Sequence, residues 1–208
     1  MRTASARCLR SVSASNLIRI KIHMTNVLMQ VVRNLETILE KIPEIRYAGD
    51  PILRQVAGPV TLEEGLSIGE RLAKVLVKYR EITGTGRGLA APQIGESKSV
   101  FVTYLDDKIE TFINPEITER SRETNFYRES CMSAGIVAAD VERAERIVLT
   151  WIDKDGVRQT GNFDGFVARL YQHEEAHLRG RLNLDDAAPG GILLVTFDPF
   201  QEKLRSVR

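Results

Sequence analysis

The chain has 208 residues, of which 43% are hydrophobic and 27% are charged, a composition typical of a soluble globular protein with one sizeable core. Charged residues interrupt every apolar stretch before it reaches the roughly 18 to 20 residues that span a bilayer, which excludes an integral membrane protein and predicts no membrane partner. Only two cysteines occur, Cys8 and Cys131, too few for a disulfide framework.

The formal net charge of +1 hides an uneven distribution. Residues 1–35 contain six of the 29 basic residues and no acid, which leaves 23 basic against 28 acidic residues in 36–208. The resulting charge of −5 on residues 36–208 is unlike that of a general nucleic-acid binder. We therefore expect no sequence-specific nucleic-acid partner.

Residues 1–35 are interpreted as a basic N-terminal extension of a catalytic domain that covers 36–208. An extension that is rich in Arg and Ser and free of acids is typical of a mitochondrial or plastid transit peptide. In the alternative interpretation, translation begins at Met24 or Met29 and the upstream residues are a gene-calling artefact or a disordered tail. The first interpretation predicts a mitochondrial or plastid protein, and the second is compatible with a bacterial cytoplasm.

The first predicted elements are a turn and a helix. Gly, Asp and Pro at 49–51 indicate a turn before an extended arm. A helix is then expected between Thr61, a typical N-cap residue, and Gly84, a typical stop. The apolar residues that recur at helical spacing in this stretch are Leu72, Val75, Leu76 and Tyr79.

Runs of β-branched and aromatic residues predict strands at 99–105, 110–113, 146–152 and 157–163, with a further strand at 190–197. The turn sequence at 153–156 joins two of them into an antiparallel hairpin. Asp164 then stands at an N-cap position, and the helix that it opens is expected to end near Gly180. The predicted fold class is α+β, with antiparallel strands packed around one central helix.

This central helix carries the sequence His-Glu-Glu-Ala-His at 173–177. On a helix, His173 and His177 lie one above the other, so both imidazoles can bind one metal ion while Glu174 points beside it toward a water molecule. Phe166 and Leu170 precede the histidines at the same helical spacing, which predicts that the histidines face the core. The motif indicates metal-assisted hydrolysis, with a chance match on a surface helix as the alternative.

The third metal ligand decides the class of hydrolase, because a catalytic zinc-like site has three protein ligands and one open position. Asn183 stands where one group of metallopeptidases has its third histidine, and Glu202 is the downstream carboxylate available for another peptidase arrangement. Cys131 is a better candidate, since a thiolate binds borderline divalent metals strongly. An inert buried thiol is the alternative interpretation of Cys131.

Three segments together resemble the peptide deformylase family. The sequence GLAAPQIG at 88–95 matches the first motif of that family, ESCMS at 129–133 resembles its EGCLS motif, and QHEEAHLRG at 172–180 resembles its QHExDHLxG motif. The order and separation of the three segments also agree, and further matches extend the similarity from about Ile45 to Asp185.

The resemblance implies an enzyme that removes the formyl group from the N-terminal methionine of newly synthesised proteins. It implies Cys131, His173 and His177 as ligands of one divalent metal ion, with Fe2+ favoured and Zn2+, Ni2+ or Co2+ as substitutes. Glu174 would act as general base and then general acid. The amide of Gln93 and the backbone N–H of Met132 would stabilise the negative charge of the intermediate.

The expected partners are N-formylmethionyl peptides, with the ribosome exit region as a candidate location. Gly88 and Leu89 would line the substrate cleft. Arg87 departs from the family pattern and falls near the expected methionine pocket. Tyr127 and Arg169 match family positions near the same pocket, and Leu170 is expected to bind substrate there too. Arg87 replaces an aliphatic residue, and its guanidinium is expected either to enter that pocket or to face water.

Ala176 replaces an aspartate of the third motif, so Arg143 is expected to lack its ion-pair partner. Two other functions remain open at the level of sequence. One is a related hydrolase that acts on another N-acyl peptide, which Arg87 and Arg169 suggest. The other is a non-catalytic relative that binds nascent chains, although Glu174, Gln93 and all three ligand candidates are present.

Overall fold

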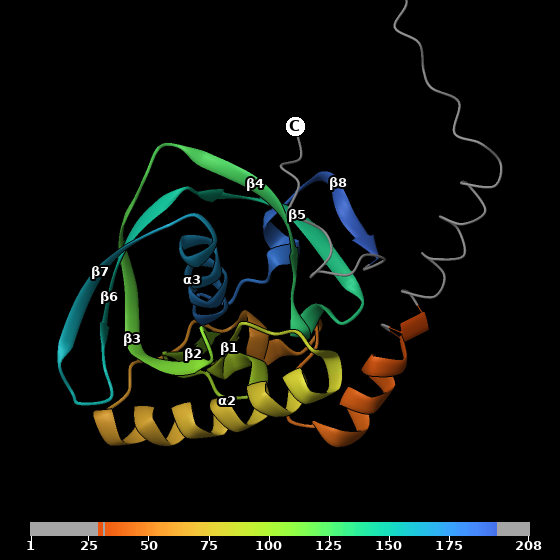
Figure 1. Ribbon diagram of the computed structural model, residues 1–208, viewed down its shortest axis with the longest axis horizontal. Coiled ribbons are helices and arrows are strands. Elements are labelled where there is room, and N and C mark those ends of the chain that lie inside the picture. Colours follow the sequence, from red (N-terminus) through yellow and green to blue (C-terminus); the bar gives the residue numbers. More distant parts are fainter. Residues whose placement is uncertain (1–28, 31, 195–208) are drawn as a thin grey trace, which may run out of the picture.

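The computed structural model describes residues 29, 30 and 32–194 (Figure 1). Residues 29–30 and 32–41 are helical, so this helix crosses the predicted boundary between residues 35 and 36, which stays a prediction. Cys8, Met24, Glu202 and the end of the predicted strand 190–197 lie outside the described residues. Within the described residues, no helix is both long enough and apolar enough to cross a membrane.

A five-stranded sheet forms one side of the described part of the chain, in the order β1, β2, β3, β6, β7 with all neighbours antiparallel. Its strands are β1 (Gly88–Ala90), β2 (Val100–Leu105), β3 (Lys108–Arg120), β6 (Arg146–Ile152) and β7 (Arg158–Asp164). The strand predictions for this sheet are confirmed, except that β1 was not expected and β3 is much longer than 110–113.

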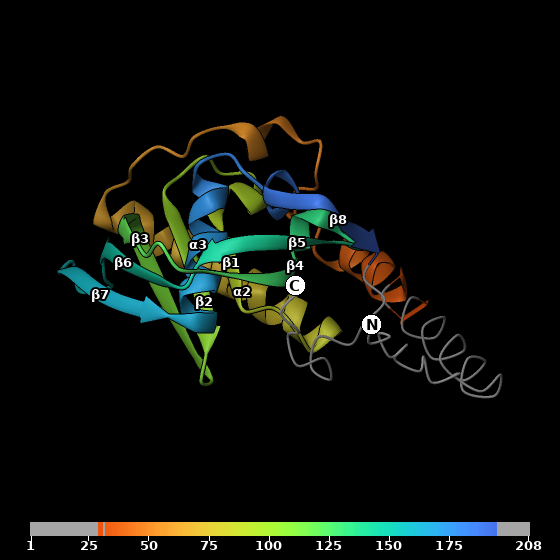
Figure 2. The same cartoon turned by 90° about the horizontal axis from the view of Figure 1, so that it is seen from above.

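A second sheet of three strands lies opposite, in the order β4, β5, β8 (Figure 2). It consists of β4 (Thr124–Ser130), β5 (Val137–Ala144) and β8 (Ala187–Leu194). The sequence predicted only the last of these, with a later start at residue 190. The sheet matters for function because β4 ends directly before Cys131.

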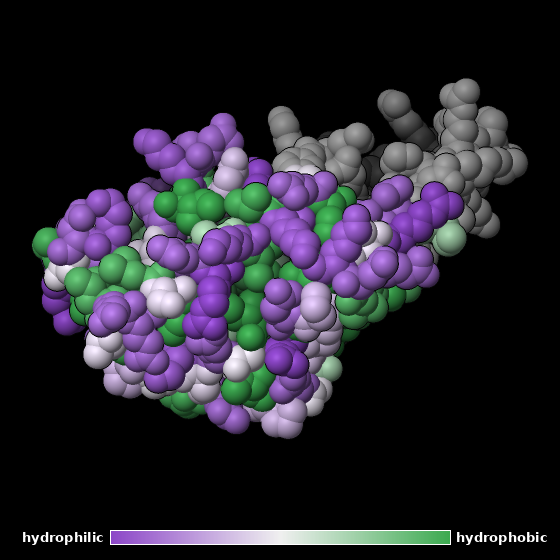
Figure 3. Space-filling view, turned by 90° about the horizontal axis from the view of Figure 1, so that it is seen from below, coloured by the Kyte–Doolittle hydropathy of each residue, from purple (hydrophilic) through white to green (hydrophobic). Residues whose placement is uncertain are grey.

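The long helix α2 (Leu62–Thr83) begins and ends as predicted. The Thr61 hydroxyl accepts a hydrogen bond from the Glu64 N–H at 3.2 Å, and Gly84 closes the helix in the left-handed conformation with φ of 71°. Gly69 lets α2 approach β3 closely, since a Cβ there would lie 2.6 Å from the Thr111 side chain. Figure 3 views the α2 side of the molecule, where polar side chains alternate with smaller apolar areas.

The helix α3 (Gly165–Leu178) lies in the middle of the molecule, between the two sheets (Figure 1). Asp164 is its N-cap residue as predicted, but its side chain makes no capping hydrogen bond, and the helix ends two residues before Gly180. From Ala168 onward every residue of α3 is buried. Phe166 is an exception to the predicted core-facing stripe, because it is 46% exposed. The predicted α+β class with a central motif-bearing helix is confirmed.

The five-stranded sheet separates two apolar cores because successive side chains of a strand point to opposite faces. On β2, Val100 and Val102 pack with α2, whereas Phe101 packs with α3. Phe101 stacks on Phe112 with ring centroids 4.6 Å apart, and Tyr171 of α3 lies 4.9 Å from Phe112. These aromatic contacts hold α3 against the sheet, two residues before the first of its histidines.

Candidate metal centre

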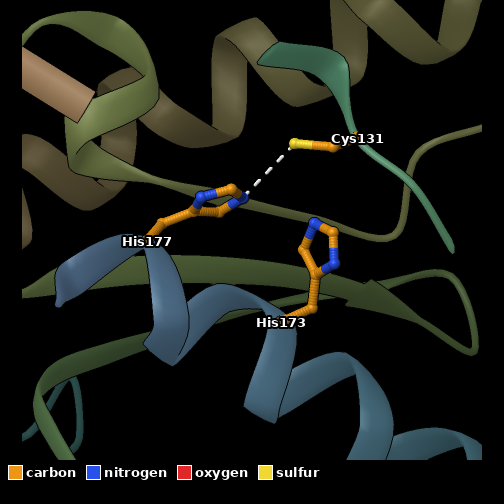
Figure 4. A group of neighbouring side chains, drawn as sticks. All are labelled: Cys131, His173 and His177. Carbon is orange, nitrogen blue, oxygen red and sulfur yellow. Dashed lines mark hydrogen bonds between the residues drawn. The ribbon is translucent and has the colours of Figure 1, made fainter. Parts of the chain in front are cut away.

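Two elements bring a thiol and two imidazoles together. His173 and His177 stand one turn apart on the same face of α3, and Cys131 follows β4 at the start of the short helix η3 (Met132–Ala134) (Figure 4). Their ligand atoms all lie within 4.8 Å of one another, and all three residues are buried. The tertiary structure therefore joins the candidate ligands that the sequence placed in separate motifs.

The hydrogen bonds of the two imidazoles orient both rings for metal binding. The Nδ1 of His177 donates to the backbone carbonyl of Arg181 at 3.0 Å, because a carbonyl can only accept. Its Nε2 faces the cluster, 3.4 Å from the Cys131 sulfur, where it can reach a bound metal ion. His173 is oriented in the same way, with Nδ1 2.9 Å from a carboxylate oxygen of Glu129.

The electrostatics of the cluster favour a thiolate. Burial by itself would raise the pKa of Cys131, but the adjacent His177 and hydrogen bonds from both imidazoles lower it well below its ordinary value. Burial likewise opposes protonation of His173, yet Cys131 and Glu129 raise the pKa of that imidazole well above its ordinary value. These interactions favour a negative charge on Cys131 and a positive charge on His173.

These donors fit a divalent transition metal. Ligands bound at about 2.0–2.3 Å to a tetrahedral ion are roughly 3.3–3.8 Å apart, which agrees with the 3.4 Å between Cys131 and His177. One thiolate and two imidazoles suit borderline metals such as iron and zinc. Three protein ligands also leave a position open, as a catalytic site requires.

Glu129 is a functional residue that the sequence analysis missed. Its buried carboxylate accepts two hydrogen bonds from Arg143 at 2.9 and 3.0 Å and one from Arg169, besides its contact with His173. Although burial would raise the pKa of Glu129, His173 and Arg143 hold it well below its usual range. The sequence contained one signal for Glu129, because this residue stands two positions before Cys131 in the second motif.

The expectation that Arg143 lacks a partner is wrong. Besides Glu129, its guanidinium binds Asp186 at 2.9 Å, on the short helix η4 (Asn183–Asp186). Glu129 and Asp186 therefore supply the carboxylates for Arg143 that an aspartate at position 176 would have supplied. Asn183 also supports this region, since its amide donates to the Glu129 carbonyl at 2.9 Å, so its contact is with the ligand-bearing strand rather than with the metal cluster.

Glu174 lies beside the three candidate ligands in a fully buried setting. Burial raises the pKa of its carboxyl to about 7. Among the described residues, its Oε2 has no hydrogen-bond partner although it is inaccessible to solvent. Gly88 packs directly against this side chain, because a Cβ at Gly88 would lie 2.3 Å from Oε1. A buried carboxyl without a protein partner is suited to exchange protons with a bound molecule.

Gln93 lies next to Cys131, on the short helix η2 (Ala91–Ile94). Its carbonyl accepts a hydrogen bond from the Ala90 N–H at 2.8 Å, which fixes the orientation of the amide. The amide nitrogen then points toward Cys131, 3.5 Å from its sulfur and 3.2 Å from the Ser133 hydroxyl. A donor held in this way is available to a negatively charged group at the site.

A cavity of about 280 Å³ opens onto these groups. Its lining includes Cys131, His173, Glu174, Gln93 and Met132, together with four of the predicted substrate residues, namely Arg87, Gly88, Arg169 and Leu170. The other two do not line it. Leu89 is fully buried in the apolar core, and Tyr127 contacts the cavity-lining Arg169, whose guanidinium lies 5.0 Å from the centroid of the Tyr127 ring.

The comparisons with known proteins point to one family. The family of polypeptide deformylases matches residues 42–191. A peptide deformylase of Dictyoglomus thermophilum is 42% identical over 147 residues, which cover 70% of this chain and 93% of that protein. The relative from Treponema pallidum (strain Nichols) is 38% identical over 144 residues, 68% of this chain and 86% of that protein.

Solved structures agree with this result. The crystal structure of a peptide deformylase from Thermotoga maritima matches with a TM-score of 0.64 and 37% identity, and covers 70% of this chain and 97% of that one. A class I type b peptide deformylase from Acinetobacter baumannii, crystallised with bound Met-Ala-Ser, matches with a TM-score of 0.62 and 30% identity over 68% of this chain and 96% of that one. The chain therefore belongs to the peptide deformylase family.

Proposed function

We propose that this protein is a metal-dependent hydrolase that removes the formyl group from the N-terminal methionine of newly synthesised proteins. The observation that carries this function is the convergence of Cys131, His173 and His177 beside the unpartnered carboxyl of Glu174, in a chain of the peptide deformylase family. The peptide bound to the relative from Acinetobacter baumannii supports a peptide substrate.

Cys131, His173 and His177 would hold the metal ion, and we propose Fe2+, with Zn2+, Ni2+ or Co2+ as substitutes. When bound, a divalent ion supplies a Lewis acid that lowers the pKa of a water molecule and polarises the formyl carbonyl. A cysteine ligand is consistent with ferrous iron, because soft thiolate ligands favour iron and zinc over magnesium or calcium. Glu129 and the Arg181 carbonyl keep both imidazoles in the binding orientation.

Glu174 moves the proton in the proposed reaction. Its carboxylate takes a proton from water as the water oxygen attacks the formyl carbon. It then gives that proton to the methionine nitrogen, the carbon–nitrogen bond breaks, and formate and the free amine leave. Because Oε2 has no partner among the described residues, the proton transfer breaks no existing hydrogen bond.

Gln93 and Met132 would stabilise the negative charge that develops on the formyl oxygen. The amide of Gln93 is already held by the Ala90 N–H and directed toward the cluster. The Met132 N–H follows Cys131 directly, at the start of η3. Donors fixed before the reaction stabilise the transition state without a cost of reorganisation.

The place of action follows from the substrate. Formylated N-termini are made where translation starts with formylmethionine, so we place the protein in a bacterial cytoplasm or, if residues 1–35 direct import, in a mitochondrion or plastid. Its substrate emerges at the ribosome exit region, which is the partner we propose beyond the peptide itself.

The test is purification without oxygen, metal analysis and an assay of formate release. We expect about one divalent metal ion per chain and release of formate from a formyl-Met tripeptide, with no hydrolysis of the matching acetyl-Met tripeptide. Metal-loaded protein that leaves the formyl peptide intact would reject the proposed function.

A further inference from the structure

The rim of the cavity carries a positive charge that the described protein does not neutralise. Arg87 lines the cavity, and its side chain is exposed. Within residues 29–194 except 31, its guanidinium has no ion pair and no hydrogen bond; only its backbone carbonyl is engaged, by the Tyr104 N–H at 2.8 Å. The other two arginines of the lining differ in this respect.

Those two arginines are bound to carboxylates. Arg128 pairs with Asp140 at 2.9 Å, and Arg169 binds Glu129 at 2.5 Å and is only 5% exposed. Glu129 is fully occupied by its cationic neighbours, and Glu174, the other carboxylate in the lining, belongs to the catalytic group. No carboxylate of the described lining is therefore available to Arg87.

Arg87 also stands close to the reacting groups. It directly precedes Gly88, the residue whose Cα packs against the Glu174 carboxyl. A residue of an extended peptide spans about 3.3 Å, and an arginine side chain reaches roughly 6–7 Å from its Cα. A guanidinium anchored one residue from Gly88 can thus reach side chains one or two residues beyond the formylated one.

The surrounding charge increases this positive potential. The guanidinium of Arg80 donates to the Gly86 carbonyl at 2.6 Å and lies 3.7 Å from the centroid of the Tyr104 ring. Arg80 is therefore fixed next to the segment that carries Arg87. Arg80 does not line the cavity itself, but its guanidinium adds to the positive charge beside Arg87, which favours an anionic ligand.

We propose that Arg87 is a specificity determinant that binds a carboxylate at the second or third residue of the substrate. The preferred substrates would then be formylated peptides with Asp or Glu directly after the methionine or one position later. This inference rests on the proposed function, because it names the class of peptide that the same cavity accepts.

The experiment compares matched peptides at low ionic strength. The pairs are formyl-Met-Asp-Ser with formyl-Met-Asn-Ser, and formyl-Met-Ala-Asp with formyl-Met-Ala-Asn. We expect kcat/KM to be about two- to fivefold higher for the acidic member of at least one pair, the range for an ion pair in contact with water. The preference for the acidic peptides should disappear in R87Q and shrink in 0.5 M salt. In R87E it should invert, so that the same peptides with Lys in place of Asp become the better substrates.

The matched control is R158Q, which removes an exposed arginine on β7 that is not part of the cavity lining. It should keep the wild-type preference, and thermal unfolding of all variants checks that they are folded. The inference would be overturned if the ratio of kcat/KM between the Asp and Asn peptides were equal in wild type and R87Q. It would also be overturned if R87Q changed kcat/KM by the same factor for every peptide. Failure of wild type to release formate from the neutral peptides would instead reject the proposed function.

Discussion

At the scale of single residues, the site depends on how closely Gly88 and Glu174 approach each other. The cleft backbone can touch the Glu174 carboxyl only because Gly88 has no Cβ. This contact places the proposed substrate-binding edge at Gly88 next to the carboxyl that we propose to move the proton. Two substitutions separate the contributions of the backbone and of the carboxyl.

The first prediction concerns E174Q. Glutamine keeps the shape of the side chain but cannot accept the proton from water, so kcat should fall by at least about a hundredfold while metal content stays at the wild-type level. Formate release and metal analysis on the same sample test this. The control is E119Q, at an exposed position on β3, which should leave both values unchanged. Near-normal turnover in E174Q would reject Glu174 as the base.

The second prediction concerns G88A. A Cβ at 2.3 Å from Oε1 is closer than any real contact, so the Glu174 carboxyl must move. We expect kcat to fall about tenfold or more, since displacement of a catalytic group by about 1 Å has a large effect on rate. G58A is a suitable control, because the nearest atom to its added Cβ is 3.9 Å away. Wild-type kinetics in G88A would show that the carboxyl does not need this position.

At the scale of elements, Glu129 connects the second sheet with α3 and η4. It stands on β4, its partner Arg143 on β5, and Arg169 and His173 on α3, while Arg143 also binds Asp186 of η4. A carboxylate buried among two guanidinium groups and an imidazole is strongly coupled to all of them. The candidate metal ligand His173 and the packing of the second sheet therefore depend on the same charge.

The third prediction is that E129Q loses both stability and metal affinity. Removing the charge leaves buried Arg143 and Arg169 without their anion, which should lower the free energy of unfolding by about 3–5 kcal/mol. Replacing the charged acceptor of His173 by a neutral amide should weaken metal binding by about 10- to 100-fold. Denaturant unfolding and metal titration measure these two effects.

The control for this prediction is E123Q, which removes one partner of an ion pair whose side chains are 58% and 65% exposed. Such a surface pair contributes at most about 1 kcal/mol. A similar loss of stability in both variants would contradict the role of Glu129.

The same network shows why the sequence predicted some elements and missed others. The run of β-branched and aromatic residues in 146–152 and the caps of α2 are local signals, and these elements were predicted correctly. In β4 and β5, by contrast, the charged residues Glu129, Asp140 and Arg143 are buried. Local patterns assign charged residues to solvent, and only pairing between distant strands makes their burial favourable.

In the candidate site, too, local motifs predicted some residues, whereas others depend on contacts between distant parts of the chain. The motifs predicted Cys131, His173 and His177, and the structure brings them together. Glu129 as the partner of His173, and Asp186 as the partner of Arg143, depend on contacts across 44 and 43 positions of the chain. A sequence pattern read along one helix or strand does not contain such contacts.

At the scale of the whole molecule, the metal centre joins the two halves of the fold. Cys131 directly follows β4 of the second sheet, whereas both histidines belong to α3, whose aromatic residues pack on the five-stranded sheet. A metal ion bound by all three side chains would cross-link these parts. Because the ligands come together only in the folded chain, metal binding should stabilise the folded state.

The fourth prediction follows for removal of the metal. Free metal at one hundred times its dissociation constant contributes about 2.7 kcal/mol to the stability of the folded state. For a domain of this size, 1 kcal/mol corresponds to roughly 2–4 °C, so a chelator should lower the Tm by about 5–10 °C and abolish formate release. Adding Fe2+ or Zn2+ back should restore both the Tm and formate release.

C131A is the decisive comparison for this prediction, since it lacks one ligand and its Tm should not respond to chelator or metal. An equal response of C131A would mean that the stabilising ion binds elsewhere, and that Cys131 does not link the two sheets through the metal.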